Sequence, residues 1–207
     1  MGRAERKDRD KREMRELILK AAKKLFVDKG FENITMRRIA DEIEYSPGTV
    51  YLYFKDKLDI LCALQEVGFA ELYRRQQILL TVKNPAERLR ACGKVYIDFA
   101  MENQELYDIM FIMQATQKGI SWEADSMSIG KQSYEELFNI VKDCIDQGYM
   151  KKVQPEIATF MCWSLMHGIA SIIIRERAVM IPKEHLPYMV DGVLDFLMSE
   201  ILDKEMV

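Results

Sequence analysis

The stretch EYSPGTVYLYFKDK, residues 44–57, concentrates the side chains best suited to binding an anionic surface. Tyr51 and Tyr53 can donate hydrogen bonds from their hydroxyl groups to phosphate oxygens, and Lys57 adds a cation. This chemistry is binding rather than catalysis, because along the chain we can place no nucleophile with its base, no phosphate-binding loop and no pair of carboxylates. The sequence therefore predicts a binding protein and not an enzyme.

Two local tendencies compete within this stretch. The segment TVYLYF is β-branched and aromatic and on its own favours a strand. Ser46 and Pro47, however, are residue types that cap a helix and occupy its first turn. In a helix from Pro47 to Phe54, Val50 and Phe54 lie on one face and can pack in a core. We therefore predict a helix whose small first residues let its backbone approach a partner closely.

Two earlier helices must position this one. Apolar residues at helical spacing predict a helix over residues 17–30, and Thr35 is placed to cap a second helix over residues 36–43. A three-residue break, residues 44–46, then separates two short helices, which is the pattern of a helix-turn-helix. In that fold the second helix enters the DNA major groove with its first residues facing the bases.

The remainder of the chain predicts further helices and no strand. Helical spacing and cap residues indicate helices from Lys57 towards Leu80 and over residues 85–103, 106–113, 134–145, 155–176 and about 187–203. The segment 119–130 is less regular. The predicted fold class is all-α with about nine helices, in two domains, residues 1–56 and residues 57–207.

Charge is distributed unevenly along the chain. Residues 1–60 contain 15 lysines and arginines against 12 acidic residues, and the rest of the chain contains 15 against 21. A basic N-terminal domain suits an anionic partner, although an ordinary solvated surface explains the same pattern. The arm over residues 3–15 could reach a minor groove, but its mixed charge favours a frayed, solvated extension.

Cysteine spacing and N-terminal charge both indicate a cytoplasmic protein. Cys62, Cys92, Cys144 and Cys162 form no C-x-x-C pair, so we expect reduced thiols rather than a zinc site or a redox pair. The N-terminus is too charged for a signal peptide. Residues 157–174 carry no formal charge and reach the lower length limit for crossing a bilayer, but we expect protein to cover this helix on both sides.

The pieces AAKKLFVDKGF, ITMRRIA and SPGTVYLYFKDK carry a specific resemblance. In order and spacing they are similar to the TetR/AcrR family of bacterial transcriptional regulators, over residues 17–64. The resemblance implies a dimer that binds a palindromic operator. It also implies that a small molecule in the C-terminal domain changes the separation of the two recognition helices and so releases the DNA.

The same resemblance assigns roles by position. It implies that Thr35 is a cap in contact with phosphate, that Arg37 can reach a base, and that Lys57 clamps the DNA backbone. The implied DNA-contacting set is Thr35, Arg37, Arg38, Ser46, Pro47, Gly48, Thr49, Tyr51, Tyr53 and Lys57. Glu44 stands where the family usually has glycine, which predicts a mildly strained turn. Tyr45 stands where a small aliphatic residue is usual, so the turn must accommodate a larger ring.

Aromatic and methionine side chains are abundant in the C-terminal part of the chain. Ordinary core packing explains each one, but together they suit a pocket for a mainly apolar effector. The candidate ligand-contacting residues are Tyr96, Phe99, Tyr107, Met110, Phe111, Trp122, Tyr134, Phe138, Trp163 and His167. Trp163, His167 and Gly168, as W-x-x-x-H-G, resemble a subset of the family. His167 could bind a ligand or respond to pH, or it could be a hydrogen-bonded core or interface histidine.

These observations predict one function and leave two alternatives. We expect a homodimer through the helices at about 155–176 and 187–203, acting as a repressor that a small molecule releases from double-stranded DNA. Because His185 lies in a loop and no acidic cluster has ligand spacing, we expect no metal site, and we expect no cofactor. An activator of the same fold, or a small-molecule sensor that does not act through DNA, remain as alternatives.

Overall fold

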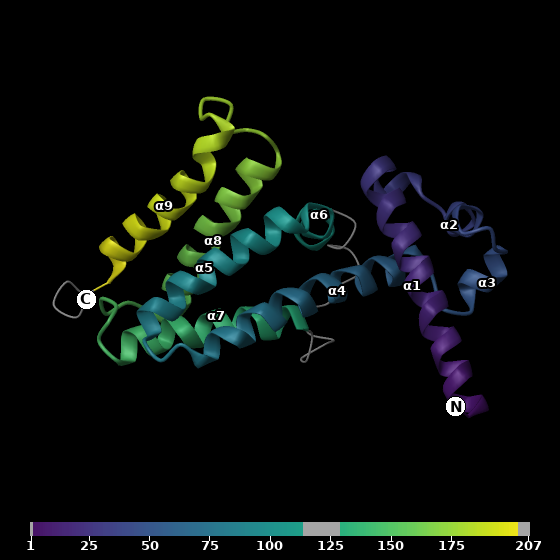
Figure 1. The fold of residues 1–207 in the computed structure, drawn as a ribbon, viewed down its shortest axis with the longest axis horizontal. Coiled ribbons are helices and arrows are strands. Elements are labelled where there is room, and N and C mark those ends of the chain that lie inside the picture. Colours follow the sequence, from purple (N-terminus) through teal and green to yellow (C-terminus); the bar gives the residue numbers. More distant parts are fainter. Residues whose placement is uncertain (1, 114–128, 203–207) are drawn as a thin grey trace. The chain divides into compact units, whose positions relative to one another are not determined.

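A computed structural model describes residues 2–113 and 129–202, and within these ranges the regular elements are helices, apart from an isolated antiparallel bridge between Met150 and Leu202 (Figure 1). The predicted all-α class is confirmed, and the described residues contain the helices α1 to α9. By their contacts they form two compact units, residues 2–68 with 105–113, and residues 69–104 with 129–202.

The first unit is built from helices whose ends are set by local sequence signals. Its elements are α1 (Arg3–Lys29), a 3-10 turn (Phe31–Asn33), α2 (Met36–Glu42), α3 (Pro47–Tyr51), the start of α4 (Lys57–Ile78) and α6 (Gln104–Phe111). Gly30 ends α1 with a φ of 77°, a conformation that glycine adopts without steric penalty. The predicted cap of α2 is present, because the Thr35 hydroxyl oxygen accepts the Arg38 N–H at 3.2 Å.

A single core holds these helices together. Its fully buried members include Ile18, Ala22, Phe26, Ile39, Val50, Phe54, Ile60, Leu61 and Ile109. Phe26 and Phe31 contact each other edge-on, with ring centroids 5.1 Å apart. As the helical spacing predicts, Val50 and Phe54 both point into this core, so the strand propensity of TVYLYF is overridden by packing.

The second unit is a bundle of long helices around α5. It contains the rest of α4, a 3-10 turn (Leu79–Thr81), α5 (Pro85–Glu102), α7 (Ile129–Asp146), α8 (Pro155–Ile174), a second 3-10 turn (Lys183–His185) and α9 (Leu186–Ile201). Helix α5 packs against α7, α8 and α9. Asn84 caps α5 by accepting the Ala86 N–H at 2.8 Å, and Pro85 occupies the first turn.

Helix α8 buries only one side within this chain. Its buried residues are Ala158, Thr159, Cys162, Met166 and Ala170, spaced along one face. Among the described helices it is long and apolar enough to cross a membrane, yet only 28% of its most apolar window is buried in the chain. The structure agrees with the prediction that this chain covers one side of the helix, and cover of the other side by a partner stays a prediction.

Three predicted boundaries differ from the structure. The N-terminal arm is helical from Arg3, as part of α1, and is not frayed. Helix α3 ends at Tyr51 rather than Phe54. The chain turns after Tyr51, and Asp56 then accepts the Asp59 N–H and caps α4. Helix α7 begins at Ile129, earlier than predicted. Most of the segment predicted to be irregular, residues 119–128, lies outside the described residues.

Candidate nucleic-acid interface and ligand pocket

The turn between α2 and α3 is tight and contains a residue in the left-handed region. Glu44 has a φ of 59°, as its position in place of a glycine predicts. The turn is closed by the Tyr45 N–H, which donates to the Ala40 carbonyl at 3.0 Å. The Tyr45 side chain is 46% exposed, so the turn accommodates the larger ring by leaving much of it in solvent.

The start of α3 is fixed by its own hydroxyl groups. The Ser46 hydroxyl oxygen accepts the Thr49 N–H at 3.2 Å and lies 3.0 Å from the Thr49 hydroxyl. Pro47 sits in the first turn, and Gly48 is exposed beside it. This arrangement leaves a smooth, polar helix start at the surface, which suits close approach to a groove.

The end of α3 and the two residues after it carry large side chains at the surface. Tyr51 is 56% exposed and Leu52 is 80% exposed, whereas Tyr53 is half-buried and packs partly against the core. Leu52 was not among the residues predicted to contact DNA, although its outward position followed from the helical spacing. An exposed leucine here can contact a thymine methyl group. At the start of α2, Thr35, Arg37 and Arg38 are all exposed.

Lys57 is bonded to the backbone of the turn after α1, which the sequence did not indicate. Its ammonium donates hydrogen bonds to the carbonyls of Phe31 at 3.0 Å and Glu32 at 3.4 Å, and it stands 4.3 Å from the centre of the Phe31 ring. The side chain is 28% exposed. Lys57 therefore ties the start of α4 to the turn after α1, and its contact with DNA phosphate stays a prediction.

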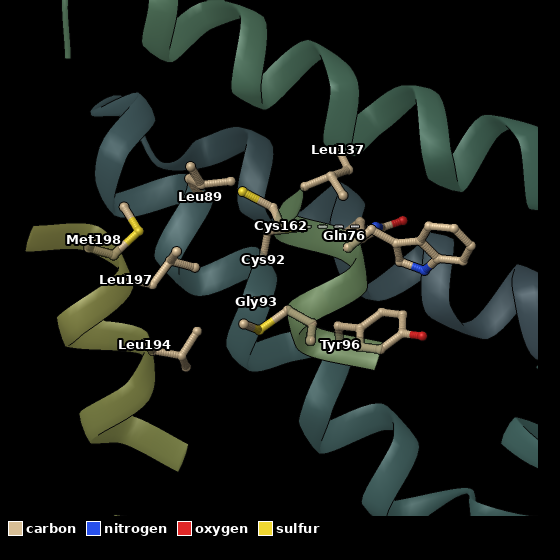
Figure 2. Close-up of a pocket in the computed structure, with 12 residues that line it drawn as sticks. Gln76, Leu89, Cys92, Gly93, Tyr96, Leu137, Cys162, Leu194, Leu197 and Met198 are labelled. Carbon is tan, nitrogen blue, oxygen red and sulfur yellow. Dashed lines mark hydrogen bonds between the residues drawn. The ribbon is translucent and has the colours of Figure 1, made fainter. Parts of the chain in front are cut away.

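The second unit contains a pocket between α4, α5, α7, α8 and α9. Its empty volume is about 460 Å³, part of which is open solvent, and Figure 2 shows its walls. The lining residues are Gln76, Leu89, Cys92, Gly93, Tyr96, Leu137, Cys162, Trp163, Met166, Leu194, Leu197 and Met198. Most of them are apolar, as is typical of small-molecule sites.

One polar lining residue is held by its neighbours. Gln76 is 4% exposed, and its side-chain oxygen accepts the Ser133 O–H at 2.7 Å. Its amide nitrogen donates to the Ser133 carbonyl at 3.3 Å and lies 3.9 Å from the Cys92 sulfur. These bonds fix the amide and tie α4 to α7 at the wall of the pocket.

A second polar group joins α5 to α8. The Tyr96 hydroxyl lies 3.1 Å from Nδ1 of His167, and the His167 ring is 5.9 Å from that of Trp163. Burial, with a smaller contribution from Arg175, lowers the pKa of His167 below its usual 6.5. The imidazole is therefore neutral at physiological pH, and the pair offers polar but uncharged atoms.

The cysteines around the pocket are inert thiols. The thiols of Cys92, Cys144 and Cys162 are all free and buried. Burial raises the pKa of Cys92 and Cys144 to about 12 and that of Cys162 to about 11. At neutral pH these groups stay protonated and act as small apolar side chains rather than nucleophiles. Among the described residues no three metal-ligating side chains are grouped to hold an ion.

The structure brings some of the predicted ligand residues together and separates others. Tyr96 and Trp163 line the pocket, and His167 and Tyr134 contact them. Tyr107, Met110 and Phe111 belong to the first unit, whereas Phe99 is buried in the second. Phe138 is half-buried on α7, and Trp122 lies outside the described residues. The wall residues outside the predicted set are leucines, cysteines, methionines, Gly93 and Gln76, which carry no distinguishing pattern.

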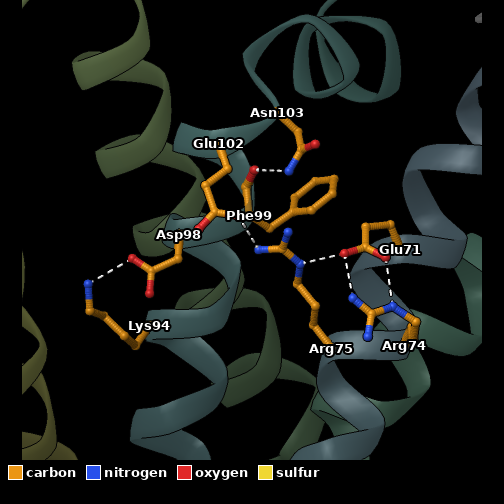
Figure 3. Close-up of polar contacts among 8 residues, drawn as sticks. All are labelled: Glu71, Arg74, Arg75, Lys94, Asp98, Phe99, Glu102 and Asn103. Carbon is orange, nitrogen blue, oxygen red and sulfur yellow. Dashed lines mark hydrogen bonds and ion pairs between the residues drawn. The ribbon is translucent and has the colours of Figure 1, made fainter.

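A charged network joins α4 to α5 (Figure 3). Arg75 contacts Glu71 and Glu102, each at 2.8 Å, and its guanidinium lies 5.6 Å from the centre of the Phe99 ring. Hydrogen bonds from Arg74 and then Arg75 lower the pKa of Glu71 to about 2. Glu71 is therefore ionised at any physiological pH, and the network persists as charged pairs.

Comparison with known proteins gives matches along both units. Residues 18–64 match the family described as "Bacterial regulatory proteins, tetR family", and residues 89–197 match the "Tetracyclin repressor-like, C-terminal domain". The chain is 29% identical over 153 residues to the uncharacterized HTH-type transcriptional regulator YfiR of Bacillus subtilis, covering 71% of this chain and 72% of that protein. It is 24% identical over 161 residues to YuxN of the same species, covering 78% of this chain but only 54% of YuxN. The chain thus spans about half the length of YuxN.

Solved structures share the fold. The regulator FadR from Bacillus subtilis in complex with stearoyl-CoA superposes with a TM-score of 0.73 at 21% identity, over 90% of this chain and 98% of that one. AibR in complex with isovaleryl coenzyme A and operator DNA gives a TM-score of 0.68 at 20% identity, over 88% and 96%. The W-x-x-x-H-G subset is not tested by these matches. The family matches confirm the predicted resemblance: the chain belongs to the TetR family of bacterial regulatory proteins, which are transcriptional regulators and not enzymes.

Proposed function

We propose that the protein is a homodimeric repressor that binds a palindromic operator and is released when a mainly apolar molecule occupies the pocket of the second unit. The observation that carries this proposal is the first unit's α3. Its start is polar and exposed, its inner side chains are buried, and its cap is formed by Ser46. A surface of this kind has a clear use in the major groove.

Operator contacts follow from the exposed side chains. Because their side chains lie at the surface, we expect Arg37 and the first residues of α3 to read bases, and the hydroxyls of Thr35 and Tyr51 to contact phosphates. Leu52 adds an apolar contact. Because phosphate contacts do not depend on base sequence, their loss weakens binding to all DNA, whereas loss of a base contact changes the preferred operator.

The dimer would form through the uncovered sides of α8 and α9. Large apolar side chains stay exposed there, with Phe160 at 60%, Ile157 at 57%, Tyr188 at 78% and Phe196 at 69%. An apolar surface of this kind on a soluble chain marks an interaction site. A second copy of the same two helices is its natural complement, because a two-fold axis pairs each helix with its own copy in a four-helix interface.

The effector site is the pocket lined mainly by apolar residues. Its walls come from α4 as well as α5, α7, α8 and α9, so a ligand that enlarges the pocket changes the packing of α4. Helix α4 is continuous from Lys57 to Ile78 and so belongs to both units. FadR and AibR share this fold and were solved with stearoyl-CoA and isovaleryl coenzyme A, and these ligands support an effector with an apolar part. A cytoplasmic location accords with this role.

Recovery of genomic DNA fragments by the purified protein tests the proposal. We expect the bound fragments to share a palindrome with half-sites about one helical turn or somewhat more apart. Tyr51→Phe should weaken binding to these fragments, and Tyr45→Phe, which changes a ring outside the predicted contacts, should not. A reporter gene behind the operator then separates repression from activation by the sign of its response. Recovery of no shared sequence would contradict the proposal.

A further inference from the structure

Gly93 in α5 stands in the wall of the pocket, where side chains from two other helices reach the α5 backbone. A Cβ atom at this position would lie 2.8 Å from Cδ2 of Leu194 on α9 and 3.1 Å from Sδ of Met166 on α8. Nonbonded carbon atoms are usually about 3.5–4.0 Å apart, so a side chain fits here only if these two residues move. Glycine is a poor helix former, but in this helix it permits a contact that a larger residue would disturb.

The two side chains that use this space also line the pocket. Leu194 is 1% exposed and Met166 is 5% exposed, so atoms of the chain surround both of them. Figure 2 shows Leu194 projecting from α9 on the side where Gly93 lies. The open space next to either side chain is therefore the pocket itself. While residue 93 is glycine, Leu194 and Met166 lie back against α5 and leave the pocket open to a ligand.

The surface that these three residues present to the pocket suits a hydrocarbon group. A leucine methyl group and a methionine thioether pack well against aliphatic carbon, and burial of each methylene group of a ligand raises affinity about fourfold. We propose that Gly93 sets the size of the hydrocarbon group that the pocket admits, because it lets Leu194 and Met166 withdraw from the cavity. This inference rests on the proposed role of the pocket as the effector site.

A series of straight-chain alcohols measures this size limit. Isothermal titration calorimetry on the full-length chain gives the dissociation constant of each alcohol from 1-hexanol to 1-decanol, which differ only in chain length. In the unaltered chain, affinity should rise about fourfold per methylene group until the pocket is full. In Gly93→Ala the displaced side chains should fill part of this space. This variant should bind 1-hexanol as before but 1-decanol about four- to fifteenfold more weakly, as for one or two lost methylene contacts.

Gly192→Ala in α9 is the matched control, because a Cβ atom there meets no atom within 4 Å. This variant should bind every alcohol as the unaltered chain does. Unchanged binding of 1-decanol in Gly93→Ala would overturn the proposal. An equal loss for 1-hexanol and 1-decanol would also overturn it, since such a loss is not a limit on size.

A double variant tests whether the effect of Gly93→Ala passes through Leu194. In a Leu194→Ala background the atom nearest to the added methyl group is absent, and Met166 can adjust because its side chain is flexible. Gly93→Ala should then change the affinity for 1-decanol by less than about twofold. The same background should restore folding if Gly93→Ala alone does not fold. If thermal melts show that neither variant folds, Gly93 serves packing alone and the proposal is wrong.

The same samples distinguish failure of this inference from failure of the proposed function. If Gly93→Ala leaves the size limit unchanged, or no alcohol binds, but the protein still recovers a palindromic DNA sequence, this inference is wrong and DNA recognition stands. If the size limit shifts as expected but no DNA is recognised, the inference stands and the proposed repressor is wrong.

Discussion

Gly68 in α4 provides a sharp test of the packing in the first unit. A Cβ atom added at Gly68 would overlap the sulfur of Met110 and lie 2.9 Å from its Cγ. Met110 belongs to α6 and is buried, so its side chain crosses α4 at the one place where no side chain stands in the way. We predict that Gly68→Ala destabilises this unit although alanine is the better helix former.

The magnitudes follow from two opposing effects. Alanine in place of glycine within a helix gains about 1 kcal/mol. Forcing Met110 out of its packed rotamer costs about 1–3 kcal/mol, so the net effect of Gly68→Ala is a loss of about 1 kcal/mol. Met110→Ala alone should cost about 2–5 kcal/mol by leaving a cavity. In that background the added methyl group meets empty space, and Gly68→Ala should then stabilise the unit by about 1 kcal/mol.

Hydrogen exchange of peptides from α4 and α6 measures these changes locally in the full-length chain, where global unfolding of two units need not be two-state. The control is Gly192→Ala in α9, where an added Cβ meets no atom within 4 Å. Its effect should be the same with and without Met110, since the two sites are independent. If Gly68→Ala has the same sign in both backgrounds, the proposed steric conflict with Met110 is wrong.

Three further predictions concern DNA, assembly and pH. Arg37→Ala should relax base preference without loss of stability. Lys57→Ala should weaken binding to all DNA sequences, and it should also lower the melting temperature of the first unit because its bonds to the turn after α1 are lost. Salt titrations of DNA binding, together with thermal melts, distinguish the two variants. Phe160→Arg should yield a monomer at micromolar concentration in sedimentation, and a persistent dimer would place the interface elsewhere. Because the pKa of His167 is lower in the folded chain, the unfolded chain binds a proton first as pH falls. The contribution of neutral His167 to stability is therefore fully present above about pH 6.5 and is lost as pH falls below it. His167→Gln should flatten this loss in thermal melts recorded from pH 7.5 to 5.

The parts of the DNA-binding unit that follow local rules could be predicted from sequence. Ser46 and Thr35 were expected to cap their helices, and both hydroxyl oxygens accept the expected backbone N–H. Val50 and Phe54 were expected in the core from helical spacing, and both are buried. These features depend on residues within one or two turns, so the short sequence contains the information.

Features that depend on distant segments could not be predicted in this way. Lys57 was expected to contact the DNA backbone, and its bonds to the carbonyls of Phe31 and Glu32, more than twenty residues earlier in the chain, were not foreseen. The pocket walls come from five helices, and its leucines and cysteines look like any core residues in sequence. The aromatic inventory therefore identified Tyr96 and Trp163 but also included Tyr107, which is buried in the other unit.

The hydropathy of helix α8 alone does not show what covers the helix. Mean hydropathy over the helix is equally consistent with a membrane span, a buried core helix and an interface helix, because each is apolar on all sides. The arrangement of side-chain sizes separates these cases. Alanine or cysteine stands at most of the buried positions, where neighbouring helices approach closely, while Ile157, Phe160 and Ile172 are half exposed or more. A core helix of a monomer would turn such large side chains inward. The size pattern, with Ala158, Cys162 and Ala170 on the buried face, therefore favours a helix covered by a second protein surface, and it was already present in the sequence.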